Sequence, residues 1–385
     1  MIEKALTGSK RYWGWIGSLI GVSGIGLVFY LAQWFSGSEM TGMSRDVSWG
    51  LSIANYTFLV GVAASAVMVV LPYYLHDYKA FGAVTALGEF LAVVAIAMSI
   101  LFIFVDLGQP FRAFNILFYP TPNSPFFWNM VILPAYLLFN LVIGWAMLDA
   151  DSKSVPPLFW VKPLIYISIP WGISIHTVTA FVYAGLAARP FWNTAILAPR
   201  FLVSAFASGP SLLILMCMII KRFTRFDPGE KAIQKLVTII AYSMILNLFF
   251  IILEIFSSFY GSIPSHIVGL EYLLFGLEGY TKLVPLTWIS LVFAVAGTLL
   301  LVTPYARRTD SVLSAALVMV FFSLWIDKGL CLVVTGFIPS PFERITEYSP
   351  SLFEGVIAVG IWAVGFLILS VLYKIVITIK EELIT

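Results

Sequence analysis

The residues of this sequence that could do chemistry are ionisable side chains that lie inside long apolar stretches. A charge in the hydrocarbon core of a membrane is costly unless it is paired or solvated, which makes each such residue a candidate functional group. Carboxyl, imidazole and amino groups take up and release protons, so the chemistry that they favour is proton transfer. The candidates are Glu89, Asp106, His176, Glu254, Asp327, Lys328 and Glu354.

Each candidate also has a structural interpretation. Asp327 and Lys328 are adjacent and therefore point about 100° apart on a helix, so we expect them to pair with other helices rather than with each other. His176 is also explained by hydrogen-bonded packing, and Glu354, near a helix start, by the positive end of the helix dipole. Glu89 has no comparable structural explanation and is therefore a candidate for a proton relay.

Ten apolar stretches must position these side chains. The 385-residue chain is 60% hydrophobic and 11% charged, with a mean hydropathy of +0.96, which excludes a soluble globular domain. About 20 apolar residues cross a membrane, and we expect spans at 13–33, 51–75, 84–105, 127–148, 164–186, 199–220, 236–260, 284–302, 312–334 and 352–373. The sequence therefore predicts an all-α integral membrane protein, with residues 1–385 forming a single polytopic membrane domain. No cleavage pattern follows the first stretch, so we expect it to be a retained anchor.

The basic residues predict the orientation of these helices. Most of the 22 lysines and arginines fall on alternate connecting segments, together with both chain ends. Because Lys and Arg are retained on the cytoplasmic side during insertion, we expect both termini to be cytoplasmic in a multi-pass protein of the inner membrane. The segments of the other face are longer, notably 106–126 and 261–283, and they either form a docking surface or simply cover the helix ends.

A short internal repeat indicates two related halves. The pattern Phe-Leu-Val, followed after three intervening residues by Ala-Ser, occurs at 58–65 and again at 201–208. Both copies run in the same direction across the membrane. Since membrane proteins are often built from repeats, we expect two four-helix bundles at 51–186 and 199–334, with peripheral helices at 13–33 and 352–373.

Cysteine and histidine usage limits the redox cofactors that this chain can hold. Cys217 and Cys331 lie in separate spans, which leaves no ligand set for an iron–sulfur cluster. His76, His176 and His266 do not form the matched axial pairs that the haems of a membrane cytochrome b require. We therefore expect no metal site in this chain, and any redox role must use a diffusible cofactor or partner proteins.

Two segments resemble the NrfD/polysulfide reductase membrane-subunit family. The turn 106–112 reads Asp-Leu-Gly-Gln-Pro-Phe-Arg, and Ser124-Pro125 and Trp128 follow it, similar to the family's Asp-Leu-Gly-Arg-Pro-x-Arg turn and its Ser-Pro helix start. The segment around His176, with Trp192 after it, is similar to the family's histidine-containing span. The resemblance covers all ten spans and is strongest to the members that serve Dsr electron-transfer complexes of sulfur metabolism. Gln109 departs from the pattern, because the family's first arginine is missing there.

The resemblance implies a membrane subunit, not catalytic alone, of a quinone-dependent oxidoreductase complex. A subunit of this kind has no haem or iron–sulfur cluster, binds menaquinone or another quinone near the outer surface, and exchanges electrons with an extracytoplasmic ferredoxin-like iron–sulfur subunit. The resemblance also implies cytochrome b, cytochrome c and cytoplasmic iron–sulfur subunits as partners, in contact with membrane lipid and without nucleic acid.

On this basis, acids, bases and hydrogen-bonding groups near the outer surface are expected to bind the quinone head group. Those residues are His176, Asp106, Arg112, Arg200, Glu254 and Tyr260. A quinone also needs protons when it is reduced, and positioned ionisable groups supply them. Glu89, Asp327 and Lys328 are expected to form a proton path, which could serve proton translocation.

Two other functions fit parts of the sequence. A secondary transporter would also have ten helices, a repeat and charges near the membrane centre. A purely structural membrane anchor for redox subunits would explain the long outer segments, although it leaves Glu89 and His176 without a role. Transport of a labelled solute without partner proteins, or loss of electron transfer in an assembled variant, distinguishes these alternatives.

Overall fold

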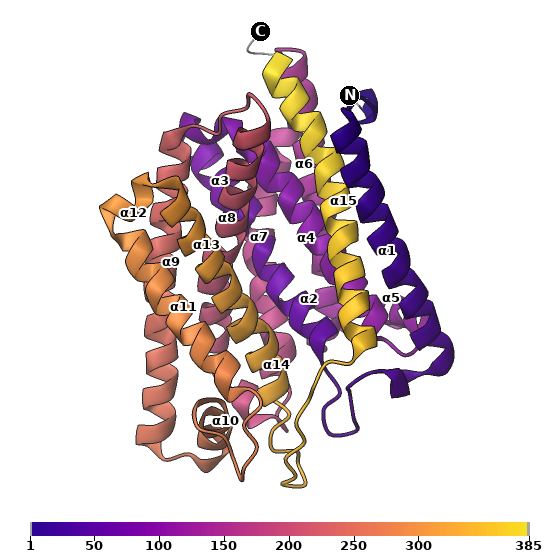
Figure 1. Cartoon of the computed structure of the whole chain (residues 1–385), viewed down its shortest axis with the longest axis vertical. Helices are drawn as coiled ribbons and strands as arrows, with labels where there is room; N and C mark the ends of the chain where they lie inside the picture. The colour runs from indigo at the N-terminus through magenta and orange to yellow at the C-terminus, as the bar shows by residue number, and fades with distance from the viewer. Residues whose placement is uncertain (1, 383–385) are drawn as a thin grey trace.

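The computed structural model describes residues 2–382, and its long elements are α-helices (Figure 1). Ten helical segments in this range are long and apolar enough to cross a membrane, which confirms the expected number of spans. They are Lys10–Ser36 (α1), Leu51–Leu75 (α2 and α3), Thr85–Asp106 (α4), Pro125–Ser152 (α6), Val161–Ala184 (α7), Leu197–Phe223 (α8), Glu230–Gly261 (α9), Val284–Val302 (α11), Asp310–Thr335 (α13, η6 and α14) and Leu352–Glu382 (α15).

Two of the spans are irregular. The second divides into α2 (Leu51–Val62) and α3 (Ser65–Leu75), and the ninth passes from α13 (Asp310–Leu324) through the π-helix η6 (Trp325–Cys331) into α14 (Leu332–Thr335). Shorter helices lie in the connections. They are Ile2–Leu6 (η1), Ser38–Met40 (η2), Lys79–Ala83 (η3), Pro110–Phe114 (η4), Asn115–Phe118 (α5), Pro190–Trp192 (η5), Pro264–Leu274 (α10) and Pro304–Arg308 (α12).

Several helices continue beyond the apolar stretches. α9 begins at Glu230 rather than at 236, and α15 ends at Glu382 rather than at 373. The added turns contain charged residues such as Lys231 and Lys380, and Lys380 binds Asp151 of α6 at 2.6 Å. Hydropathy marks the hydrocarbon core, and the helices extend past it.

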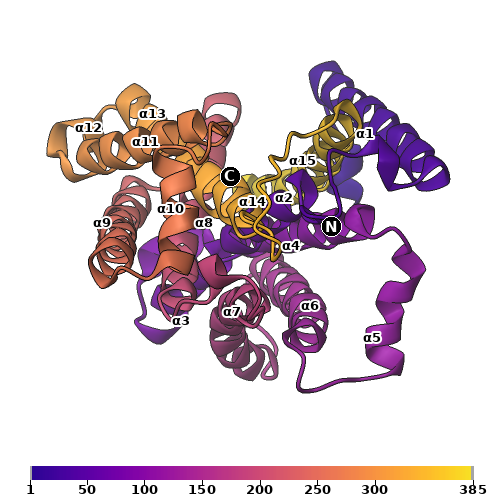
Figure 2. The same ribbon diagram turned by 90° about the horizontal axis from the view of Figure 1, so that it is seen from below.

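The helices pack as two groups that meet along α2, α3 and α8 (Figure 2). In the first group, α2 packs on α4, α4 on α6, and α6 on α7. In the second, α8 packs on α9 and α13, and α11 packs on α9 and α13. We propose that these groups are the two four-helix bundles expected from the repeat. α1 and α15 pair with each other at the side of α4.

Both termini lie at one end of the molecule, here called the terminal end, while α5 and α10 lie at the other, here called the far end (Figure 1). The helices therefore cross the same layer an even number of times. Assignment of the terminal end to the cytoplasm stays a prediction from the basic residues.

The two copies of the short repeat pack directly against each other. A Cβ atom on Gly209 of α8 would lie 2.6 Å from the backbone nitrogen of Ser65 and 2.7 Å from the carbonyl oxygen of Val62. Only glycine lets the backbone of α8 approach the junction of α2 and α3 this closely. Small residues at such contacts favour helix association in lipid, where apolar burial alone provides little driving force.

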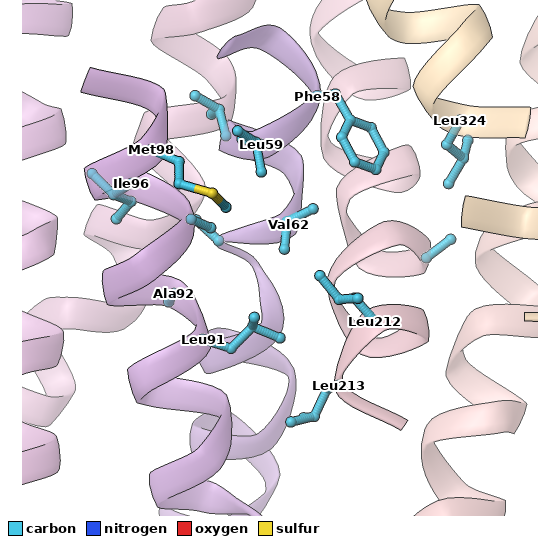
Figure 3. Close-up of a cluster of buried hydrophobic side chains, with 14 of the residues drawn as sticks. Phe58, Leu59, Val62, Leu91, Ala92, Ile96, Met98, Leu212, Leu213 and Leu324 are labelled. Carbon is cyan, nitrogen blue, oxygen red and sulfur yellow. The ribbon is translucent and has the colours of Figure 1, made fainter. Parts of the chain in front are cut away.

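Apolar side chains fill the space around this contact. Figure 3 shows Phe58 and Val62 of α2, Leu91 of α4, and Leu212 and Leu213 of α8 gathered between the helices. All are buried. This core joins the two groups of helices along the middle of the molecule.

Glu354 joins loops at the far end in addition to lying in the first turn of α15. Its carboxylate accepts hydrogen bonds from the backbone nitrogens of Gly42 at 2.7 Å and Ser351 at 2.8 Å, and from the Tyr348 hydroxyl at 2.6 Å. The same hydroxyl accepts a bond from the Leu51 nitrogen at 2.8 Å. Burial, followed by the bond to Glu354, raises the pKa of Tyr348, so its hydroxyl remains a donor. The interaction with the helix dipole that the sequence predicts thus does not account for most of the contacts of this carboxylate.

Replacement of Gly26 by valine is expected to separate α1 from α15. A Cβ atom at Gly26 would lie 2.6 Å from the Cα of Gly360, whereas one at Gly21 meets nothing within 4 Å. Overpacking of this kind costs about 1–3 kcal/mol. Thermal unfolding of the purified protein should show a lower midpoint for Gly26→Val and little change for the matched Gly21→Val. Equal midpoints for the two variants would contradict this contact.

Candidate functional site

A cavity of about 320 Å³ opens at the far end of the first group of helices. It lies between α2, α4, α6 and α7, and most of its lining is apolar, including Ile53, Ile103 and Leu133. A few polar side chains converge on it. Those side chains are Tyr56, Asp106, Gln109, Arg112, Asn129 and Tyr183. An apolar pocket of roughly 300–1,000 Å³ with few polar groups is typical of a small-molecule site.

The turn after α4 builds one side of this cavity. Asp106 is the last residue of α4, and Pro110 starts η4, where its fixed φ and missing N–H suit the first helical turn. Arg112 follows in η4, and α5 then stands away from the bundle (Figure 2). We call residues 107–118 the arm. Ala113 and Ile116 of the arm face the cavity. The cavity is therefore bordered by a short segment rather than by a further membrane helix.

The outer edge of the same arm is aromatic and exposed. Phe111 and Phe118 are 72% and 74% exposed, and the Phe111 ring lies 5.8 Å from that of Trp34 at the end of α1. Aromatic rings collect at the boundary between hydrocarbon and headgroups. The arm thus has an apolar edge toward the membrane and a second edge toward the cavity.

Hydrogen bonds hold the polar groups at the inner part of the cavity. The Asn129 side-chain nitrogen donates to the Tyr56 hydroxyl at 2.8 Å, and the Thr179 hydroxyl donates to the Asn129 oxygen at 3.3 Å. The Tyr183 hydroxyl is hydrogen-bonded to that of Thr57. These bonds connect α2, α6 and α7, so the polar groups are positioned before any ligand binds.

Asp106 and Arg112 are the two charged residues of the cavity lining. They form no ion pair with any residue of the described range 2–382. The carboxyl group of Asp106 can therefore exchange a proton or a hydrogen bond with a bound molecule, and Arg112 is exposed. Gln109, which stands where the turn of the family has its first arginine, also lines the cavity. The difference from the family pattern therefore lies in the cavity lining.

Aromatic side chains close the cavity toward the second group of helices. The rings of Trp49 and Trp192 stack with centroids 5.5 Å apart, and Tyr183 meets Trp49 edge-on at 5.5 Å. Phe337 packs edge-on against both tryptophans. Gly336 is required here, because a Cβ atom would lie 1.9 Å from the Trp192 ring. We call Trp49, Tyr183, Trp192 and Phe337 the aromatic wall.

A buried ionic cluster lies beyond this wall. Arg200 of α8 binds Asp327 of η6 through Nη2, at 2.7 and 2.9 Å from the two carboxylate oxygens, and Glu254 of α9 through Nη1. The three side chains are only 12–21% exposed. A guanidinium suits this place because its fork of donors serves two carboxylates at once. A cavity of about 40 Å³ beside the cluster has room for a few water molecules.

The two adjacent charges of the π-helix η6 point in different directions. Asp327 faces Arg200, while the Lys328 amino group donates to the carbonyl of Phe201 at 3.3 Å and lies 4.3 Å above the ring of the same residue. The expectation that these neighbours pair with other helices rather than with each other is confirmed for Asp327. Single-turn π-helices frequently occur at functional sites. The hydropathy of the sequence did not predict the π-helix η6.

Two further candidates are buried without partners. Neither ring nitrogen of His176 and neither carboxyl oxygen of Glu89 has a hydrogen-bond partner within residues 2–382. His176 lies on α7 within electrostatic range of Lys328, and the Glu89 carboxyl group lies against Gly144 of α6. Neither residue lines one of the cavities described above.

The structure thus divides the six residues expected at the quinone. Asp106 and Arg112 share the large cavity, Arg200 and Glu254 share the ionic cluster behind the aromatic wall, and His176 lines neither cavity. Tyr260 is 81% exposed and stacks on Phe256 along α9, away from both places.

Sequence reasoning missed the neutral members of the site. The predicted candidates were mostly charged residues of the spans, whereas Tyr56, Asn129 and Tyr183 carry much of the polarity of the large cavity. Asn129 had a usable signal, because a side-chain amide in an apolar span also needs partners.

The fold is that of a polytopic helical membrane protein with an apolar cavity at one end. Comparison with protein families then places it: residues 39–338 match the model of NrfD, polysulphide reductase, and the chain belongs to this family. The resemblance read from the turn 106–112 is thereby confirmed. The matched region leaves out α1 and α15, the helices that pair beside α4.

Relatives of known name support the same class. The chain is 23% identical to the Hdr-like menaquinol oxidoreductase integral membrane subunit of Archaeoglobus fulgidus, over 97% of this chain and 95% of the relative. It is 22% identical to a selenate reductase subunit of Mesobacillus selenatarsenatis, over 91% of each. It is 20% identical to the menaquinone reductase integral membrane subunit of Nitratidesulfovibrio vulgaris, over 95% and 91%. The protein is accordingly a multi-pass integral membrane protein.

Loss of the Arg200 guanidinium should destabilise the protein strongly. Arg200→Met leaves two buried carboxylates unpaired, and breaking a buried ion pair costs about 3–5 kcal/mol. The triple variant Arg200→Met, Glu254→Gln, Asp327→Asn removes all three charges and should recover most of the lost stability, since neutral replacement of a whole buried ionic group is often tolerated. Thermal unfolding in detergent measures both. A single variant as stable as the wild type would show that the cluster is not a closed ionic group.

Proposed function

We propose that this chain is the quinone-interacting membrane subunit of a respiratory redox complex, exchanging electrons between membrane menaquinone, or another quinone, and an iron–sulfur partner. The observation that carries the proposal is the large apolar cavity at the far end, with Asp106, Tyr56 and Asn129 converging on it. Menaquinol and menaquinone occur in the names of two relatives that match almost the whole chain.

The cavity suits the two parts of a quinone. Apolar residues of α2, α4 and α6 would hold the tail and the faces of the ring, and hydrogen-bonding groups would meet the carbonyl oxygens. In this arrangement Asp106 binds one side of the head group, and the paired Tyr56 and Asn129 bind the other. Arg112 lies in the exposed arm, where it would orient Asp106 or contact a partner.

The remaining residues of the expected quinone set receive other proposed roles. His176, Arg200 and Glu254 lie outside the lining of the large cavity, as do Asp327 and Lys328. Ionisable groups buried together between helices can hold and release protons, so this second region is a proposed route for proton translocation. A head-group contact by Tyr260 would need a binding position on the exposed side of α9.

An extracytoplasmic ferredoxin-like iron–sulfur subunit is the proposed electron partner. It would dock on the far end, close to the cavity, where the connection Gly261–Leu283 with α10 and the arm 107–118 lie. Cytochrome b, cytochrome c and cytoplasmic iron–sulfur subunits, as in Dsr complexes of sulfur metabolism, complete the proposed assembly. The inner membrane, with the terminal end in the cytoplasm, is the proposed location.

Quinone binding to the purified complex tests this function. We expect Asp106→Asn to weaken binding of a short-chain naphthoquinone about 2- to 10-fold, because a quinone carbonyl only accepts hydrogen bonds, so the protonated Asp106 carboxyl group must donate, and a neutral hydrogen bond contributes about 0.5–1.5 kcal/mol. Asn129→Leu should weaken it as well, and its matched control is Asn247→Leu, which replaces a buried asparagine of α9 outside the cavity. Extraction of bound quinone and titration of the naphthoquinone give the readout.

The other outcomes separate the alternatives. Unchanged binding in Asp106→Asn and Asn129→Leu would reject this cavity, and His176→Ala would then test the second region. Complex that contains and binds no quinone at all would favour the structural anchor. Uptake of a labelled solute by vesicles without partner proteins would favour the transporter.

A further inference from the structure

Helix α6 carries a line of polar residues that continues from the cavity toward the terminal end. Asn129, Tyr136, Asn140, Gly144 and Asp151 follow one another at intervals of four or seven residues, which places them on one face of the helix. The two asparagines and Tyr136 are each less than 10% exposed. A lipid-facing stripe would be apolar, so this face is built for contacts inside the protein.

Glu89 of α4 meets this face at Gly144, in the half nearer the terminal end. A Cβ atom on Gly144 would lie 3.0 Å from the Glu89 carboxyl oxygen Oε2, so the missing side chain makes room for the carboxyl group. Glu89 is only 1% exposed, and both of its oxygens lack a hydrogen-bond partner among the described residues. An unpaired buried carboxylate is costly, and a native structure rarely keeps one without a role.

Two tyrosine hydroxyls extend the line on both sides of Glu89. Tyr136 of α6 and Tyr74 of α3 lie within electrostatic range of its carboxyl group. Both hydroxyls are buried and, in the part of the chain that the structure describes, unpaired. Each unpaired buried polar group costs about 1–3 kcal/mol. The two carboxyl oxygens and the two hydroxyls make four such atoms at one place. Ordinary side-chain packing would not leave four buried polar atoms unpaired together.

The line reaches the surface at the terminal end. Asp151, near the last turn of α6, also lies within electrostatic range of Glu89 and binds Lys380 of α15 at 2.6 Å. The Asp151 side chain is 36% exposed, so water reaches this end of the line. At the opposite end of the line, Asn129 is hydrogen-bonded to Tyr56 in the cavity lining.

Apolar packing surrounds this line on the other side of α4. Leu91 of α4 points toward Val62 and Leu213 in the core (Figure 3). That interface offers no ionisable side chain among the labelled residues. The polar groups beside α4 are thus concentrated toward α3 and α6.

We propose that Asp151, Tyr74, Glu89, Tyr136, Asn140 and Asn129 form a proton path between the terminal end and the cavity. This inference rests on the proposed quinone site. Glu89 is the group that holds and passes the proton, and the hydroxyls and amides orient water molecules between the side chains. Water is needed because residues 129 and 151 of α6 are about 33 Å apart along the helix, farther than direct hydrogen bonds among these side chains reach.

The proton path balances the chemistry of a quinone. Reduction of one quinone to quinol takes two electrons, supplied by the reduced iron–sulfur partner, and two protons, which form O–H bonds at the two carbonyl oxygens. Each proton leaves the Glu89 carboxyl group toward the cavity, and a proton from water at the terminal end then replaces it. Quinol oxidation reverses each step and reduces the iron–sulfur partner.

Turnover of the purified complex in liposomes tests this path, with a short-chain naphthoquinone and a pH-sensitive dye on the terminal side. We expect Glu89→Gln to lower both turnover and proton exchange at least 10-fold while naphthoquinone binding stays within about 2-fold of wild type. Glu89→Asp should restore part of the rate, and Tyr136→Phe should increase the solvent deuterium isotope effect. Asn140→Leu should slow turnover, whereas the matched Asn247→Leu should not.

A spectroscopic readout separates a proton carrier from a merely structural residue. Redox-difference infrared spectra should contain a carboxyl band that disappears in Glu89→Gln. Normal turnover in assembled Glu89→Gln and Tyr136→Phe, or a spectrum without that band, would overturn the path. Loss of naphthoquinone binding in Asp106→Asn with intact Glu89 supports the cavity independently, so failure of the path and failure of the site give different results.

Discussion

Lipid offers no hydrogen bonds and little solvation for charge, so the polar side chains of this chain must find their partners within the helix packing. Close backbone contact makes that possible. At Gly209, α8 touches the junction of α2 and α3, and the two groups of helices meet there. Near this contact Arg200 binds two carboxylates and Lys328 lies on the ring of Phe201. The lipid-facing surface can then remain apolar.

This arrangement produces two polar regions rather than one. The large cavity with Asp106 lies among α2, α4, α6 and α7, and the ionic cluster of Arg200 lies among α8, α9 and η6. The aromatic wall stands between them, with Trp49 and Trp192 stacked at its centre. A quinone in the cavity would therefore exchange protons through groups on its own side of the wall, while the cluster serves the other half of the molecule.

The family match also has a structural counterpart. It covers residues 39–338, the part of the chain that builds the cavity, the wall and the cluster. α1 and α15 lie outside it and are held together by the contact of Gly26 with Gly360. Even so, α15 supplies Lys380, which binds Asp151 at the proposed entrance of the proton path. A peripheral helix can thus influence a site that it does not line.

Hydropathy and the spacing of Asp106, Pro110 and Arg112 were enough to predict ten spans and the family, because the thickness of the membrane and the geometry of a turn act locally along the chain. Partner choice was not local. Asp327 pairs with Arg200 of α8, a partner 127 residues away in the sequence. The meeting of Tyr56 with Asn129, and of Glu89 with Gly144, depends on how helices distant in sequence are rotated against each other. The rotation of each helix about its axis depends on how it packs against all of its neighbours. The tertiary structure alone therefore decided which polar residues share a site.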